Sequence, residues 1–82
     1  MIFLIEYDRP ESRIVTFTTF KNSERLNAEK SRLDLELRLN RAGVDHEVVI
    51  LEAESEEALR RTHRRYFEDA RTIVTSASAG NG

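Results

Sequence analysis

The sequence predicts a two-layer α/β plait of the α+β class, with the order β-β-α-β-α and a three-stranded mixed sheet that carries both helices on one face. Three short segments rich in β-branched and aromatic residues predict the strands, at residues 1–7, 14–20 and 47–53. Two longer segments without interior glycine or proline predict the helices, at residues 24–42 and from residue 56 onward.

The first two strands are predicted to form an antiparallel hairpin. Residues 1–7 are apolar on both faces of the pleat. The six residues between the strands supply turn chemistry: Pro10 fixes φ and lacks an N–H donor, while Asp8 and Ser12 can bond the nearby backbone. Two strands joined by such a polar loop are typical of a hairpin.

The first helix is predicted between good caps and a glycine. Asn22 and Ser23 can cap its N-terminus, and the segment up to Ala42 is rich in Leu, Ala, Glu and Arg. Gly43 follows, with the apolar Val44 behind it, as expected of a left-handed C-cap. The third strand then begins near Glu47 and is again apolar on both faces.

The second helix is predicted to start after Ser55, which can cap it, and to continue along one apolar stripe made of Ala58, Leu59, Thr62, Tyr66, Ala70 and Ile73. Residues 71–75, with Ile73 and Val74, fit either a fraying helix, which we favour, or an extended segment. We expect one compact domain over residues 1–75 and a disordered tail over residues 76–82, which are small and polar.

The connections predict how the strands are ordered. A right-handed crossover through the first helix makes the third strand parallel to the second. We expect the first strand to lie between them and antiparallel to both. The arrangement resembles part of a ferredoxin-like split βαβ unit in architecture only.

The first helix carries more apolar surface than one sheet contact needs. On a helical wheel, Leu26, Leu33 and Leu37 form one stripe, and a second stripe lies roughly 180° away. We assign this second stripe to a dimer interface; it consists of Ala28, Leu35, Leu39 and Ala42.

The strands indicate the same surplus, because a two-layer fold leaves one sheet face uncovered and neither the first nor the third strand alternates. Four or five exposed large apolar side chains would be an aggregation hazard. We therefore expect a homodimer, the commonest assembly, with another protein as a further possible partner. The alternative is a monomer in which strand twist and the tail cover the sheet.

Residues 60–67 form the most basic segment. On a helix, Arg60, Arg64 and Arg71 share one side with Phe67 beside them, and such a row could contact phosphates and stack a base. The same helix offers i,i+4 pairs of a solvated face, namely Glu56 with Arg60, Glu57 with Arg61 and Arg64 with Glu68. We favour the salt-paired face and keep anion or nucleic-acid contact as the alternative.

No catalytic, cofactor or metal site is predicted. The chain has no cysteine, and its two histidines, His46 and His63, lack metal-binding spacing. A glycine-rich phosphate loop is missing as well. Tyr7 and Asp8 beside the polar loop could act in acid–base chemistry only within a pocket that an oligomer interface would supply.

The composition limits the classes of function. An apolar content of 39% argues against a wholly disordered chain, and 13 Lys+Arg against 15 Asp+Glu exclude a strongly basic nucleic-acid coat. The apolar run at residues 1–5 is too short for a signal peptide or a membrane span, so we expect a soluble cytoplasmic protein without a membrane partner. The sequence predicts a non-enzymatic, homodimeric binding or interaction module. The alternatives are a small nucleic-acid-associated regulator that uses the arginine-rich helix and a dimeric enzyme with an interface site.

Overall fold

The computed structural model describes residues 1–67. Along the chain these form β1 (Ile2–Asp8), β2 (Arg13–Phe20), a 3₁₀ turn η1 (Asn22–Glu24), α1 (Arg25–Ala42), β3 (Glu47–Glu52), α2 (Glu56–Thr62) and a second 3₁₀ turn η2 (Arg64–Tyr66). This confirms the order β-β-α-β-α. The predictions for residues 71–75 and for the tail at 76–82 lie outside the described residues.

β1 is the central strand of the sheet, whose order is β2-β1-β3, as predicted. It pairs antiparallel with β2 and antiparallel with β3. The sheet is therefore antiparallel throughout, and the predicted mixed sheet is wrong. β2 and β3 do run in the same direction, but β1 separates them, so no parallel ladder forms.

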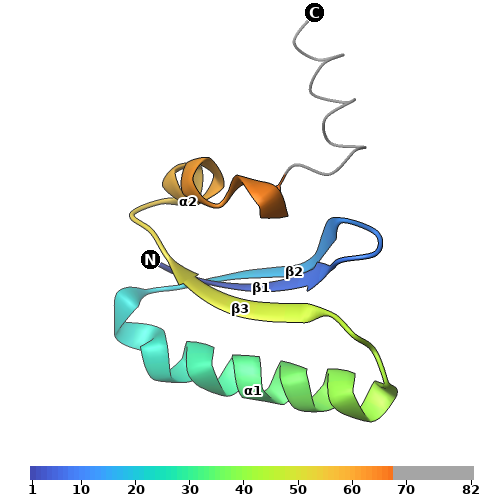
Figure 1. The fold of residues 1–82 in the computed structure, drawn as a ribbon. Helices are drawn as coiled ribbons and strands as arrows, with labels where there is room; N and C mark the ends of the chain where they lie inside the picture. The colour runs from blue at the N-terminus through green and yellow to red at the C-terminus, as the bar shows by residue number, and fades with distance from the viewer. Residues whose placement is uncertain (68–82) are drawn as a thin grey trace, which may run out of the picture.

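The two helices lie on opposite faces of the sheet, which makes three layers (Figure 1). Phe3, Ile5 and Tyr7 pack with the α2 and η2 residues in one buried cluster. On the other face, Leu4 and α1 residue Leu35 line a common groove. The prediction of both helices on one face is wrong, because β1 is apolar on both sides and each side needs its own cover.

The ends of α1 follow the sequence at one terminus and differ at the other. Gly43 has φ +68°, and the N–H of Val44 bonds the carbonyl of Leu39 at 2.9 Å, which confirms the left-handed C-cap. At the N-terminus, the predicted caps lie inside η1 instead. There the N–H of Lys21 donates to the carboxylate of Glu24 at 2.8 Å. α1 begins at Arg25, one residue after the predicted start of the helix.

α2 begins as predicted, because the hydroxyl of Ser55 accepts the N–H of Ala58 at 3.1 Å. It ends at Thr62, however, before the predicted stripe residue Tyr66, and the stripe residues Ala70 and Ile73 lie outside the described residues. The break at His63 turns the chain back toward the sheet, where the Tyr66 ring packs edge-on against Tyr7 with centroids 5.2 Å apart. In an unbroken helix, Tyr66 would lie about 10 Å beyond Leu59 along the axis.

We expect Leu59→Ala to lower the free energy of unfolding by about 2–5 kcal/mol, because Leu59 is fully buried between α2 and the sheet. The control is Arg61→Ala on the same helix. Arg61 forms an exposed ion pair with Glu57 at 4.0 Å, so this substitution should change the free energy of unfolding by less than about 0.5 kcal/mol. Urea unfolding followed by circular dichroism measures both. Equal small effects would contradict α2 as the cover of this face.

Candidate functional site

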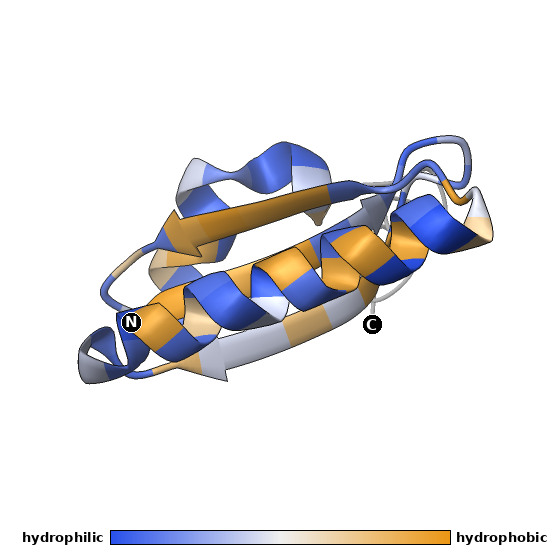
Figure 2. Cartoon of the chain, turned by 90° about the horizontal axis from the view of Figure 1, so that it is seen from below, coloured by the Kyte–Doolittle hydropathy of each residue, from blue (hydrophilic) through white to orange (hydrophobic). Residues whose placement is uncertain are grey.

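The largest exposed apolar side chains of the described helices lie along α1. Leu26, Leu33 and Leu37 are 69%, 57% and 44% exposed, and we call them the leucine stripe. They fall within about 40° of one another on a helical wheel, opposite the residues that face the sheet. Figure 2, which views the molecule from the α1 side, shows apolar residues recurring along this helix.

The other stripe of α1, which we predicted as a dimer interface, belongs largely to the core. Ala28 and Leu35 are buried within a single chain, and Leu39 is half-buried. Ala42 is exposed at the end of the helix. The assignment of Ala28 and Leu35 to an intermolecular surface is therefore wrong, since the sheet already covers them. Of the two stripes, the leucine stripe is the one that faces outward.

Charged residues flank the leucine stripe differently on its two sides. On one side, Arg32 bridges Glu29 at 3.1 Å and Glu36 at 3.8 Å, so these charges are paired within the helix. On the other side lie Lys30 and Asp34, which are both exposed. Neither of these two side chains forms an ion pair with any residue in the range 1–67.

The arginines of α2 are engaged by carboxylates, as the salt-paired interpretation predicted. Arg60 bonds Glu56 at 3.0 Å, and the Arg61–Glu57 pair spans 4.0 Å. The Arg60 guanidinium also lies 4.6 Å from the centroid of the Phe67 ring, so the structure does bring these two predicted contact residues together.

The remaining members of the predicted anion site are not assembled around them. Phe67 is half-buried and packs edge-on against Phe17, with centroids 6.0 Å apart, so its ring is part of the core cluster. Arg64 lies exposed in η2, beyond the end of α2. Arg71 and the predicted Arg64–Glu68 pair lie outside the described residues. The described part of the segment therefore offers no row of guanidinium groups along one continuous helix.

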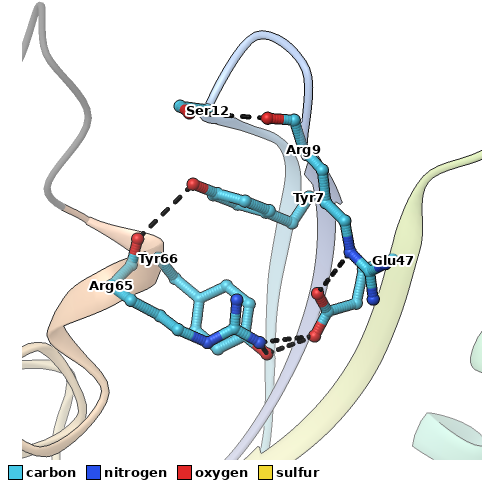
Figure 3. A network of polar contacts seen from close by, with 6 residues as sticks. All are labelled: Tyr7, Arg9, Ser12, Glu47, Arg65 and Tyr66. Carbon is cyan, nitrogen blue, oxygen red and sulfur yellow. Dashed lines mark hydrogen bonds and ion pairs between the residues drawn. The ribbon is translucent and has the colours of Figure 1, made fainter.

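A polar network around Glu47 ties η2 to the hairpin end of the sheet (Figure 3). The Glu47 carboxylate accepts the Tyr66 hydroxyl at 2.5 Å, the Arg65 guanidinium at 2.8 Å and the Arg9 guanidinium at 3.1 Å. The Tyr7 hydroxyl donates to the backbone carbonyl of Arg65 at 3.4 Å. The network thus joins β1, the hairpin loop, β3 and η2.

These contacts shift the pKa values of Glu47 and Tyr66. The hydrogen bond from Tyr66 is the main reason why the pKa of Glu47 is lowered; the donors Arg9 and Arg65 add to it, against the opposing effect of burial. Burial is the main reason why the pKa of Tyr66 is raised, followed by its bond to Glu47. The favoured state is therefore a charged carboxylate that accepts a bond from a neutral phenol.

A second polar cluster lies on the opposite face of the same sheet end. Glu6 is only 5% exposed and accepts the Thr16 hydroxyl at 2.7 Å, while its other oxygen lies 2.5 Å from His46 Nδ1. The second ring nitrogen, Nε2, lies 3.5 Å from Asp8. Each ring nitrogen of His46 thus faces a carboxylate. Because the ligand atoms do not converge, the cluster is no metal site, and none was found in residues 1–67.

Tyr7 and Asp8, which acid–base chemistry would require in one pocket, lie on opposite faces of the sheet. The Tyr7 side chain lies in the α2-face cluster, whereas Asp8 faces His46 and accepts the N–H of Glu11 at 3.2 Å. Adjacent strand residues point to opposite faces, so β1 separates the two groups. His63, the other histidine, lies 3.0 Å from the Thr62 hydroxyl at the end of α2.

One feature of the sequence could have indicated the network around Glu6. Glu6 is a lone carboxylate inside an apolar strand, and a buried carboxylate requires donors. Its partner His46 is 40 residues away, so no local spacing could identify the pair. The Glu47–Tyr66 bond was missed because it depends on the break at His63, where the apolar spacing favoured a continuous helix.

Comparison with known proteins assigns the chain to no family. No protein-family model matches the sequence, and no significant match was found among curated proteins or solved structures. Of the helices within residues 1–67, none combines the length and apolar character that crossing a membrane requires. The function of the chain is therefore inferred from the geometry of its described residues.

We expect Glu47→Gln to lower the free energy of unfolding by about 1–3 kcal/mol at pH 7, because three donors lose their charged acceptor. Folding lowers the pKa of Glu47, so its contribution is present above the ordinary value of 4.5 and is lost as the pH falls through the folded-state pKa. The difference from the wild type should therefore narrow below pH 4.5, as urea unfolding between pH 7 and 3 would show. A difference that stays constant over this range contradicts the assignment; exposed Glu57→Gln is the control.

For the second cluster, we expect His46→Leu to cost about 1–3 kcal/mol, since it leaves the buried Glu6 carboxylate with Thr16 as its remaining side-chain donor. Glu6→Leu should cost a similar amount. The double variant should cost clearly less than the two single effects together, because no buried charge is left unpaired. A double-mutant cycle from chemical unfolding measures this coupling, and strictly additive effects would show that the two groups act independently.

Proposed function

We propose that the chain is a non-enzymatic interaction module that forms a homodimer through the leucine stripe on the outer face of α1. The observation that carries this proposal is the exposure of Leu26, Leu33 and Leu37, which are 69%, 57% and 44% exposed on one side of one helix. Single exposed leucines are ordinary, but an aligned row of them is typical of a surface that another apolar surface covers. A cytoplasmic location and a relation of the β2-α1-β3 unit to ferredoxin-like plaits are part of the same proposal.

The energetics favour a reversible dimer. Burying a leucine side chain stabilises by roughly 1.5–3 kcal/mol, and two copies contribute six such side chains. Part of each is already covered, so the real gain is smaller. Association itself costs about 4–15 kcal/mol in lost freedom, a quantity of the same order. We therefore expect a dimer whose population depends on protein concentration in the micromolar range.

The other classes of function have less support. A nucleic-acid contact by α2 would require guanidinium groups that are free to reach phosphates, whereas Arg60 and Arg61 are paired with Glu56 and Glu57. An enzyme would require converging acid and base groups. The titratable clusters around Glu47 and around Glu6 lie on opposite faces of the sheet, and each acts as a tie between elements.

We expect Leu33→Glu to remain folded and to become monomeric, because Leu33 is exposed in one chain but covered in the dimer. Leu35→Glu, two residues away, should unfold the chain, since Leu35 is buried against the sheet. Val15→Glu is the matched control: Val15 is 44% exposed, like Leu37, but lies on β2, so this variant should stay dimeric. Light scattering over a concentration series, with circular dichroism, measures mass and folding.

Two outcomes would contradict the proposal. The first is a wild-type chain that stays monomeric at the highest concentration reached. The second is a folded Leu33→Glu variant with an unchanged dimer mass, which would show that the copies meet elsewhere. A band shift with RNA or DNA that weakens with salt would favour the nucleic-acid alternative instead.

A further inference from the structure

We propose that the outer edge of β2 binds the chain's own residues 71–75 as a fourth, parallel strand, in place of the fraying helix that the apolar spacing favours. The surface is the edge of β2 over residues 16–20, and its occupant is the segment RTIVT. The proposed dimer is not involved, because it uses the outer face of α1.

The edge of β2 is open within the part of the chain that the structure describes. β2 is an outer strand of the sheet, and no strand of residues 1–67 pairs with its outer side. The register with β1 shifts between Glu6 and Tyr7, which leaves Val15 without a partner across β1 and 44% exposed. The regular part of the edge is therefore residues 16–20, which contain no proline or lysine to discourage pairing. Its five residues match the length of the segment 71–75.

The last described residues cross the sheet toward this edge. The chain leaves β3 at the opposite edge and passes through α2. Tyr66 then packs against Tyr7 of the central strand, with ring centroids 5.2 Å apart, and Phe67 packs against Phe17 of β2, with centroids 6.0 Å apart. Successive residues thus contact first β1 and then β2. The next position in the same direction is the outer edge of β2.

The handedness of the connections selects the same edge. The β2-α1-β3 connection is a right-handed crossover on one face of the sheet (Figure 2). α2 lies on the other face (Figure 1), so a right-handed return from β3 leads back in the direction of β2. A strand beside the outer edge of β3 would need a left-handed crossover. Because β2 and β3 run in the same direction, the returning strand would be parallel to β2.

The chain is long enough to reach this position. The four steps from Phe67 to Arg71 span up to about 13 Å when extended. A strand beside β2 would lie about 5 Å to the side of it and about one layer, 10 Å, from the level of the helices. The direct distance is thus about 11 Å, which residues 68–70 can bridge.

The side chains of the segment also fit the surfaces beside β2. Residues 72–75 are all β-branched, as is typical of strands. Adjacent residues of a strand point to opposite faces, so Ile73 and Val74 would each face one side of the sheet. Both sides offer apolar surface there: Phe67 is half-buried on the α2 face, and Phe20 lines a groove between β2 and α1 on the other.

NMR of the full 82-residue chain tests the strand. We expect residues 71–75 to have the Cα and Cβ chemical shifts of extended backbone, and the outward-pointing amides of residues 16–20 to be protected from exchange. Of positions 73 and 74, one must direct its N–H toward β2. Ile73→Pro or Val74→Pro should therefore speed exchange of these amides at least tenfold. Ala79→Pro, beyond the segment, is the matched control and should leave them unchanged.

Disulfide trapping tests the occupant independently, because the chain has no native cysteine. Thr19 is exposed on β2. We expect Thr19→Cys, combined in turn with Thr72→Cys, Ile73→Cys or Val74→Cys, to give at least one variant that closes a disulfide within a single chain, since neighbouring strands lie within disulfide reach. Thr19→Cys with Ala79→Cys is the control and should close at least tenfold more slowly. Denaturing gels without reductant distinguish links within one chain from links between two.

The outcomes divide clearly. Extended chemical shifts, protected edge amides and a disulfide within one chain support the fourth strand. Helical shifts at residues 71–75, edge amides that exchange as fast in the wild type as in both proline variants, or the absence of a disulfide in all three pairs would overturn it. A disulfide that joins two chains would show that the edge binds the segment of a second copy, which also overturns pairing within the chain.

Discussion

The position of β1 is the constraint on which the rest of the structure depends. This strand lies between β2 and β3 in the sheet and between α1 and α2 in the layers. All side chains from Ile2 to Tyr7 are buried, so both faces of the strand require cover from elsewhere in the chain. The length of α1, the turn into α2 and the return of η2 to the sheet all serve this cover. A single short strand thus organises three layers.

Two carboxylates that are largely covered, Glu6 and Glu47, lie at the hairpin end of the sheet. One lies on each face, and each collects donors from distant parts of the chain. A buried carboxylate is costly without partners and strongly orienting with them, so these clusters fix the approach of His46 on one face and of η2 on the other. The contacts of both clusters join elements of the same chain, whereas the outer face of α1 presents exposed apolar side chains.

The cover on both faces of β1 also removes one reason to expect a second copy, namely an uncovered apolar face of the sheet. A two-layer fold would leave one face of the sheet open and would require a second copy to cover it. In the three-layer fold, Leu59 of α2 and Tyr66 of η2 cover that face, so the strands alone no longer favour assembly. What remains is the row of leucines on α1, to which the sheet contributes no cover. The apolar surface that a second copy would cover therefore lies on one helix and not on the sheet.

The sequence by itself determined the elements and their order, because strand composition, helix formers, the Ser55 cap and the Gly43 terminus all act over a few residues. It also determined that α1 has two apolar stripes. Which stripe faces the sheet, which face α2 covers and where α2 ends were decided by tertiary structure. These choices depend on contacts such as Tyr66 with Glu47 and His46 with Glu6, which join residues 19 and 40 positions apart. Local periodicity carries no record of such distant pairing, and therefore the sequence pattern alone could not reveal it.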